Sequence, residues 1–224
     1  MVLQGKTLIN KMYLEDYEKR NLSIRGSNNT LAANHIYCVG RNYSSHAREM
    51  GADEKKPPFF FSKPDWAITT SDVKYPENTD NLQHEVELVI VIGKNMSIFG
   101  YAVGVDLTQR DIQTDAKKQG KPWFRSKCFL GSAPISEVIM ADKNFNHSDI
   151  DLLLSVNGKI KQSGSCNDMI WSPVQIISKL ATEIPLYPGD LIFTGTPEGV
   201  GVIVKGDKVT ASIPGMVELS FSII

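Results

Sequence analysis

Short apolar segments rich in Val and Ile alternate along the chain with clusters of glycine, proline and asparagine, which is typical of a β-rich protein. The segment 86–92 is predicted as a buried strand, and 99–107 as a second strand. The dipeptide Asn157-Gly158 is the strongest hairpin signal in the sequence. The other expected strands are 36–39, 59–61, 67–70, 151–156, 159–162, 191–194, 200–204, 208–213 and 216–224.

Helices are expected to be few and short, at 44–50, 111–118 and 173–182. In the last of these, Val174, Ile177 and Leu180 are spaced to share one apolar face. Residues 1–33 are polar and weakly periodic, and 1–19 could hold one short helix or strand. The fold class that follows is α+β and β-rich.

Composition narrows the class of protein. The 224 residues fit one large domain or a domain with a small appendage, and 24 Lys and Arg nearly balance 25 Asp and Glu. Since no basic stripe is present, no nucleic-acid partner is expected. No apolar run approaches the roughly 20 residues that span a bilayer, so no membrane contact is expected. Cys38, Cys128 and Cys166 follow no disulfide or zinc pattern, which indicates reduced thiols and a cytoplasmic location.

Two carboxylates interrupt the most apolar stretch of the chain. Glu85 and Glu87 are two apart, so in a strand they point to the same face, where they would repel each other and lose hydration. Asp106 ends the next strand, which could lie beside them. Hard divalent cations take such oxygen ligands, so the three acids predict a metal site. The alternative is that they pair with Lys or Arg or lie at strand ends.

Two other segments carry candidate catalytic groups. His46 and Glu49 share a helical face, so Glu49 could orient the imidazole for action as a general base, on a helix that forms part of a lid. An exposed ion pair is the other interpretation. Lys127 lies in an aromatic segment, where a desolvated amine would stabilise an enolate, unless the side chain extends to water.

Groups that could hold a carboxylate follow the strands at 191–194 and 99–107. In the glycine-rich turn 194–201, the backbone N–H of Gly195 and the hydroxyl of Thr196 could bind an anion, or the turn could be only a tight connection. Arg110 and Gln113 could form a second clamp, or a solvated helix start.

Taken together, these segments resemble the fumarylacetoacetate hydrolase family, and most of all its single-domain acylpyruvate hydrolase branch. The resemblance extends in order from about Ile36 to the C-terminus. The matching motifs are 38–46 with 48–51, 84–88, 104–111, Pro122-Trp123 with Lys127, and 194–201.

This resemblance implies a mixed β-sandwich or roll, a homodimer, and Mg²⁺ or Mn²⁺ (with Ca²⁺ also possible) held by Glu85, Glu87 and Asp106. It implies a His46–Glu49 dyad on a lid helix, and Lys127, Arg110, Gln113 and Thr196 around a bound 2-oxo acid. It divides the chain into an N-terminal segment, 1–33, without an assigned role, and a catalytic domain, 34–224. One departure stands out: only 94–99 connects two strands that family members join by a longer insertion.

The activity expected is metal-dependent hydrolysis of the C–C bond of 3-acylpyruvates, such as acetylpyruvate or fumarylpyruvate, to pyruvate and a carboxylic acid. Oxaloacetate decarboxylation or keto–enol tautomerisation would use the same metal site without an attacking water. A metal-stabilised binding protein is the non-enzyme alternative, although every chemical position holds the expected residue type.

Overall fold

The structure is a computed structural model that describes residues 19–43, 57–142 and 146–224. The helix predicted at 44–50, and with it His46 and Glu49, lies outside these residues. The regular secondary structure of the described chain is mostly β-strand, with three short α-helices, which confirms the β-rich α+β class. None of these helices is long and apolar enough to cross a membrane.

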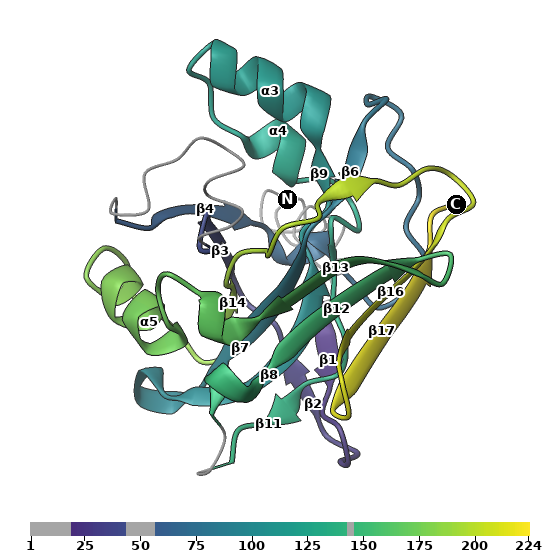
Figure 1. Ribbon diagram of the computed structural model, residues 1–224. Helices are drawn as coiled ribbons and strands as arrows, with labels where there is room; N and C mark the ends of the chain where they lie inside the picture. The colour runs from purple at the N-terminus through teal and green to yellow at the C-terminus, as the bar shows by residue number, and fades with distance from the viewer. Residues whose placement is uncertain (1–18, 44–56, 143–145) are drawn as a thin grey trace, which may run out of the picture.

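A six-stranded mixed sheet forms the centre of the molecule (Figure 1). Its central strand β7 pairs antiparallel with β8 on one side and with β14 on the other, while β14 runs parallel to β3. In spatial order the strands are β11 (Ile139–Met140), β8 (Ile98–Val105), β7 (Val86–Ile92), β14 (Leu191–Phe193), β3 (Ile36–Gly40) and β4 (Phe59–Lys63).

A four-stranded antiparallel sheet lies in front of the first in Figure 1. Its order is β13 (Lys159–Ser165), β12 (Asp151–Val156), β16 (Lys208–Ile213) and β17 (Val217–Ser222). The predicted turn joins β12 to β13, with positive φ at both Asn157 (51°) and Gly158 (75°). Two successive left-handed residues are what a two-residue hairpin of type I′ requires, so the hairpin prediction is confirmed.

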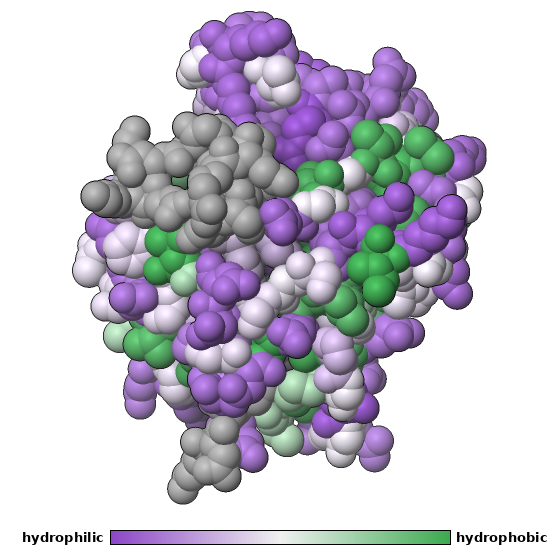
Figure 2. Space-filling view, viewed as in Figure 1, coloured by the Kyte–Doolittle hydropathy of each residue, from purple (hydrophilic) through white to green (hydrophobic). Residues whose placement is uncertain are grey.

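Smaller elements surround these two sheets. They are the hairpin β1 (Asn21–Ser23) and β2 (Thr30–Ala32), the three-stranded sheet β15 (Gly201–Val202), β6 (Leu82–His84) and β9 (Thr108–Gln109), the pair β10 (Ala133–Pro134) and β5 (Ile68–Thr69), and the helices α3 (Arg110–Lys118), α4 (Phe124–Lys127) and α5 (Pro173–Ala181). In Figure 1, α3 and α4 lie together above the sheets and α5 lies at the side. In Figure 2 the surface formed by α3 and α4 is mostly hydrophilic.

Strand β7 is buried along its whole length because the chain covers both of its faces. Leu88 and Ile90 belong to the apolar cluster shared with the four-stranded sheet, whereas Val89 and Val91 belong to a second cluster on the opposite face. Since side chains alternate along a strand, Glu85 and Glu87 share the face of Val89 and Val91. The acids therefore point away from the sandwich core, toward α4 and β4.

Two local predictions differ from the structure. The segment before Lys127 forms a short helix, α4, which its aromatic composition did not indicate. Strand β15 covers only Gly201–Val202 of the predicted 200–204. Between β7 and β8 the chain forms the 3-10 turn η2 (Lys94–Met96), with left-handed φ at Asn95 and Met96.

The predicted apolar face of α5 is also partly wrong. Val174 is 65% exposed, and Ile176 is fully buried in its place, next to Ile177 and Leu180. A capping box at Ser172 fixes where the helix begins, and packing against the sandwich core decides which side is covered.

We predict opposite outcomes for two truncations on this helix. Ile176→Ala should lower the free energy of unfolding by about 2–5 kcal/mol, because it removes fully buried methyl groups and leaves a cavity. The matched control, Val174→Ala, should stay within about 0.5 kcal/mol of the parent protein, because that side chain is in water. Urea unfolding followed by circular dichroism measures both, and similar losses in the two variants would contradict this packing.

Candidate metal centre

The three acids singled out in the sequence come from one corner of the central sheet. Glu85 lies between β6 and β7, Glu87 is the second residue of β7, and Asp106 directly follows β8. In the β7–β8 pair Glu87 is opposite Gly104. Just past the last pair of this ladder, the Asp106 N–H donates to the Glu85 carbonyl at 2.8 Å. The structure therefore brings together the three acids, as their places in two adjacent strands predicted.

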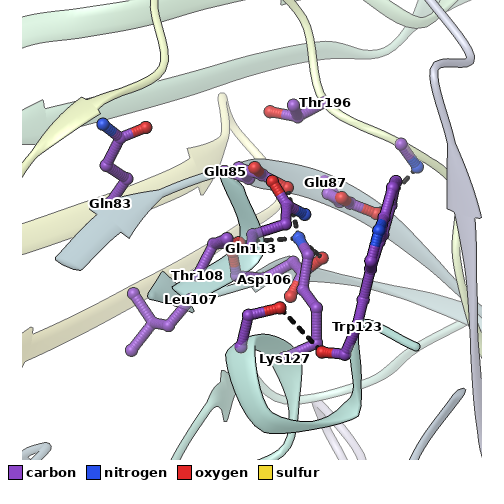
Figure 3. Close-up of polar contacts among 12 residues, drawn as sticks. Gln83, Glu85, Glu87, Asp106, Leu107, Thr108, Gln113, Trp123, Lys127 and Thr196 are labelled. Carbon is purple, nitrogen blue, oxygen red and sulfur yellow. Dashed lines mark hydrogen bonds and ion pairs between the residues drawn. The ribbon is translucent and has the colours of Figure 1, made fainter. Parts of the chain in front are cut away.

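Their carboxylates share one buried space. One oxygen from each lies within 4.8 Å of the other two, and the residues are 6%, 2% and 0% exposed for Glu85, Glu87 and Asp106. Figure 3 shows the three side chains converging between Thr196 on one side and Lys127 on the other. Carboxylates that are this close together and this little hydrated need compensating positive charge.

Lys127 supplies part of that charge. Its side chain is 2% exposed, and Nζ donates to Glu85 Oε2 at 2.8 Å, Asp106 Oδ2 at 2.5 Å and Thr108 Oγ1 at 2.6 Å. Burial alone would lower the pKa of Lys127, but Asp106 and Glu85 outweigh burial and raise it. The amine is therefore a fixed positive charge that faces the acids, and the alternative of a lysine extending to water is wrong.

Arg110, at the start of α3, forms an ion pair with Glu85 Oε1. The same guanidinium donates to Gln83 Oε1 at 2.7 Å and to Gln113 Oε1 at 2.6 Å, so it is held from three directions. Burial would raise the pKa of Glu85, but Lys127 and Arg110 hold it below its ordinary value. Arg110 and Gln113 thus lie at the site as a connected pair, not as a solvated helix start.

A third cation, Lys63, lies at the end of the edge strand β4 and was not predicted from the sequence. It is fully buried, and its Nζ lies 2.8 Å from Asp106 Oδ1. It also donates to the Lys127 carbonyl and, at 3.1 Å, to the Ser132 carbonyl, which ties the end of α4 to the acid. Nothing in the neighbouring sequence indicates that this lysine is buried, because the group that stabilises its buried charge, Asp106, is distant in the sequence.

Glu87 is the least compensated of the three acids. Among the described residues it has no ion pair, and its Oε2 accepts a hydrogen bond only from the Gly195 N–H, at 2.7 Å. Burial first, and then the charges of Asp106 and Glu85, raise its pKa well above the ordinary range. Asp106 Oδ1 is also buried, but it has the ion pair with Lys63 Nζ at 2.8 Å, so its charge is compensated.

These features fit a divalent cation. A hard cation prefers an all-carboxylate donor set, and it would relieve the repulsion that raises the pKa of Glu87. With all three acids ionised, Lys63, Lys127 and Arg110 balance them, so an added divalent ion would leave the centre doubly positive. Such a centre suits an anionic ligand.

The loop after β14 forms the opposite wall. Gly195 has φ of +97°, and a Cβ there would lie 2.8 Å from Asn42 Cβ, so only glycine fits and its N–H can face Glu87. Asn42 fixes the loop by donating to the Thr194 carbonyl at 2.8 Å, and it also donates to the Trp171 carbonyl at 3.0 Å. Thr196 is 3% exposed and lines the same pocket as the acids.

Two further cations, not singled out in the sequence, line this pocket. Arg41 has a left-handed φ of 62° and its guanidinium lies 5.7 Å from the centre of the Phe59 ring. Lys117, on α3, lies 4.8 Å from the centre of the Trp123 ring. Burial, with Arg110 and Arg41 nearby, lowers the pKa of Lys117 to about 8. Neither cation is paired with an acid among the described residues.

Comparison with known proteins agrees with this site. The family model for the fumarylacetoacetate (FAA) hydrolase C-terminal domain matches residues 35–224. Human mitochondrial oxaloacetate tautomerase FAHD1 is 39% identical over 200 residues, covering 84% of this chain and 90% of that protein. The tautomerase of the same name from Arabidopsis thaliana is also 39% identical, with the same coverage.

A solved structure is similar over nearly the whole chain. Fumarylpyruvate hydrolase from Pseudomonas aeruginosa, in complex with Mn²⁺ and pyruvate, superposes with a TM-score of 0.90 and 40% identity, covering 95% of this chain and 99% of that one. The likeness extends well beyond the site motifs, to the arrangement of the sheets. This chain therefore belongs to the fumarylacetoacetate hydrolase family.

Proposed function

We propose that this protein is a metal-dependent hydrolase that cleaves the C–C bond of 3-acylpyruvates, giving pyruvate and a carboxylic acid. The observation that carries the proposal is the convergence of three buried carboxylates beside the amine of Lys127. The similar structure that contains Mn²⁺ and pyruvate supports it. The homodimer and the cytoplasmic location stay predictions from the sequence, and the tautomerase relatives are named as mitochondrial.

Glu85, Glu87 and Asp106 would hold the metal ion, and Mg²⁺, Mn²⁺ and Ca²⁺ all suit such oxygen ligands. When bound, the ion would supply Lewis-acid polarisation of the 2-oxo acid. The protein contributes the positive charge of Lys127 and Arg110, fixed before the substrate arrives. Preorganised charge of this kind stabilises an enolate more than the neutral ketone, and this difference lowers the barrier.

In the hydrolytic reaction, His46 oriented by Glu49 would take a proton from water. The resulting hydroxide adds to the distal carbonyl carbon, the C–C bond breaks, and its electron pair remains on the pyruvate fragment as an enolate. Protonation of that carbon gives pyruvate, and the acyl fragment leaves as a carboxylate. Lys127 would face the enolate charge, while Thr196 and Gln113 would bind the 2-oxo acid end. The Gly195 N–H, expected from the sequence to bind an anion, instead donates to Glu87.

Oxaloacetate tautomerisation or decarboxylation is the second candidate. One observation favours it: several relatives are named oxaloacetate tautomerases. Arg41 and Lys117 add two cations to the pocket, and they bear on the substrate of either reaction. A substrate with a second carboxylate would pair with these cations, whereas acetylpyruvate offers nothing to them. This chemistry needs the enolate-stabilising groups but no attacking water.

Removal of the metal should abolish activity. We expect loss of the acetylpyruvate enol absorbance in the presence of Mg²⁺ or Mn²⁺, with pyruvate and acetate as products, and no loss in excess EDTA. Restored turnover after the metal is added back is the control for damage by the chelator. Unchanged turnover in EDTA would contradict the role of the three carboxylates.

Two variants should separate hydrolysis from tautomerisation. His46→Ala should lose most acylpyruvate hydrolysis, on the order of 10²-fold or more, because the general base is absent. It should keep oxaloacetate tautomerisation, whereas Glu85→Ala should lose both reactions. Near-normal acetylpyruvate turnover by His46→Ala would remove the dyad from the mechanism.

Lys117→Met tests recognition of a second carboxylate. We expect KM for oxaloacetate or fumarylpyruvate to rise by about tenfold and KM for acetylpyruvate to stay unchanged, because a charge-assisted contact is lost only in the former. The exposed neighbour Lys118→Met is the matched control. In the parent protein the dicarboxylate KM should also rise from pH 7 to 9, because the Lys117 amine loses its proton as the pH passes its pKa of about 8. Equal effects of Lys117→Met on both substrate classes would refute this assignment.

A further inference from the structure

One side chain of the four-stranded sheet reaches the wall of the pocket. Gln162 lies on the edge strand β13, whose residues 159–161 are exposed, yet Gln162 is only 1% exposed. Leu154 pairs with Gln162 but the next residue, Ser155, pairs with Ile160, so β13 contains one extra residue. Such a β-bulge redirects the side chains that follow it, and here it turns Gln162 inward while Ile160 faces solvent.

Gln162 makes four hydrogen bonds, which use both atoms of its amide completely. Its Oε1 accepts from the Val86 N–H at 3.1 Å and lies 2.8 Å from His84 Nδ1. Its Nε2 donates to Thr196 Oγ1 at 2.8 Å and to the Pro197 carbonyl at 3.0 Å. The side chain therefore connects the start of β7, which carries the acids, to the turn that follows β14.

The two backbone partners fix the orientation of this amide. The Val86 N–H can only donate and the Pro197 carbonyl can only accept, so a reversed amide would lose both hydrogen bonds. Nε2 must then donate to Thr196, and Oγ1 of Thr196 must accept. The hydroxyl hydrogen of Thr196 forms no bond to any residue that the structure describes, and Thr196 lines the pocket beside Glu85 and Glu87.

We propose that Gln162 is a positioning residue that makes the Thr196 hydroxyl a hydrogen-bond donor toward the carboxylate of the bound 2-oxo acid. A free threonine hydroxyl rotates and can donate or accept. With one lone pair occupied by the Gln162 N–H, this hydroxyl keeps its proton for the pocket. The inference rests on the proposed function, because it needs an anionic ligand at this site.

Tight packing supports a fixed distance between β13 and the turn. A Cβ at Gly164 would lie 2.4 Å from Pro197 Cβ, and one at Gly199 would lie 2.3 Å from the Lys161 carbonyl. The two segments thus approach as closely as glycine allows. A hydrogen bond across this contact is held by the backbone on both sides.

The test is the affinity for pyruvate in saturating Mn²⁺, measured by calorimetry on the parent protein, Gln162→Met, Thr196→Val and the double variant. Each single change should weaken pyruvate binding by about tenfold, the scale of one hydrogen bond to a charged group. The double variant should bind within about twofold of Thr196→Val, because both changes remove the same interaction. In turnover assays the loss should fall on KM and leave kcat nearly unchanged.

Gln162→Glu is a second variant in case Gln162→Met folds poorly. The ionised carboxylate still accepts from Val86 and His84 but cannot donate to Thr196, and its negative charge also disfavours an anion, so a loss of affinity of at least about tenfold is expected. Asn157→Gly is the matched control on the same hairpin. It removes the hydrogen bond from Asn157 Nδ2 to Asp207 Oδ1 (2.7 Å) and the one that Asn157 Oδ1 accepts from the Lys208 N–H (2.9 Å). Both lie at the β12–β13 turn, away from Thr196, so the variant should have a lower Tm and an unchanged pyruvate affinity.

Three results would overturn the inference. If the loss of pyruvate affinity in the double variant equalled the product of the two single losses, Gln162 would act on something other than Thr196. Pyruvate affinity unchanged in the folded Gln162 variants, while Thr196→Val weakens it, would show that the hydroxyl needs no positioning. Failure of the parent protein to bind pyruvate with Mn²⁺ would instead remove the proposed function, and the inference with it.

Discussion

Mutual repulsion among three buried carboxylates is the constraint on which the rest of the site depends. Glu85, Glu87 and Asp106 have almost no contact with water, and each ionised group left unpaired there would cost several kcal/mol. Compensation comes from three cations, Lys63, Lys127 and Arg110, which belong to β4, α4 and α3. The edge strand and both helices must therefore dock against the acid-bearing corner of the central sheet.

The positive charges are distributed unevenly among the three acids, and this favours binding of a metal ion. Glu85 has two cations, whereas Glu87 has only the Gly195 N–H among the described residues. A set of carboxylates that was fully neutralised would have little to gain from a metal ion. Here one acid is left with a raised pKa, which is the condition that a divalent cation relieves. The same amines then remain beside the ligand as fixed positive charge.

The pocket also depends on contacts between layers. The turn that contains Gly195 and Thr196 follows β14, next to β7. Its conformation is supported by Asn42, which lies just after β3, and by Gln162 from the other sheet. The bulge in β13 and the glycines at 164 and 199 permit that close approach. A side chain far from the acids in sequence thereby decides which way a hydroxyl in the pocket can point.

The sequence by itself determined the features that depend on neighbouring residues. The two-residue period of Glu85 and Glu87 placed both acids on one face, and Asp106 at the end of the next strand placed it beside them, because adjacent antiparallel strands pair. Asn157-Gly158 specified a hairpin through its own backbone preferences. The alternation of short apolar segments with turn residues is local too, which is why the β-rich class followed from it, whereas the sandwich or roll was implied by the family motifs.

Only the tertiary structure decided which groups compensate the acids and which faces are covered. Lys63, Gln162 and Arg41 look like ordinary surface residues in the sequence, and the face of α5 that packs inward differs from the face its spacing predicted. Burial and pairing depend on partners tens of residues away, such as Asp106 for Lys63 and Thr196 for Gln162. The hydrophobic pattern of neighbouring residues cannot indicate those partners, because they come together only when the layers pack.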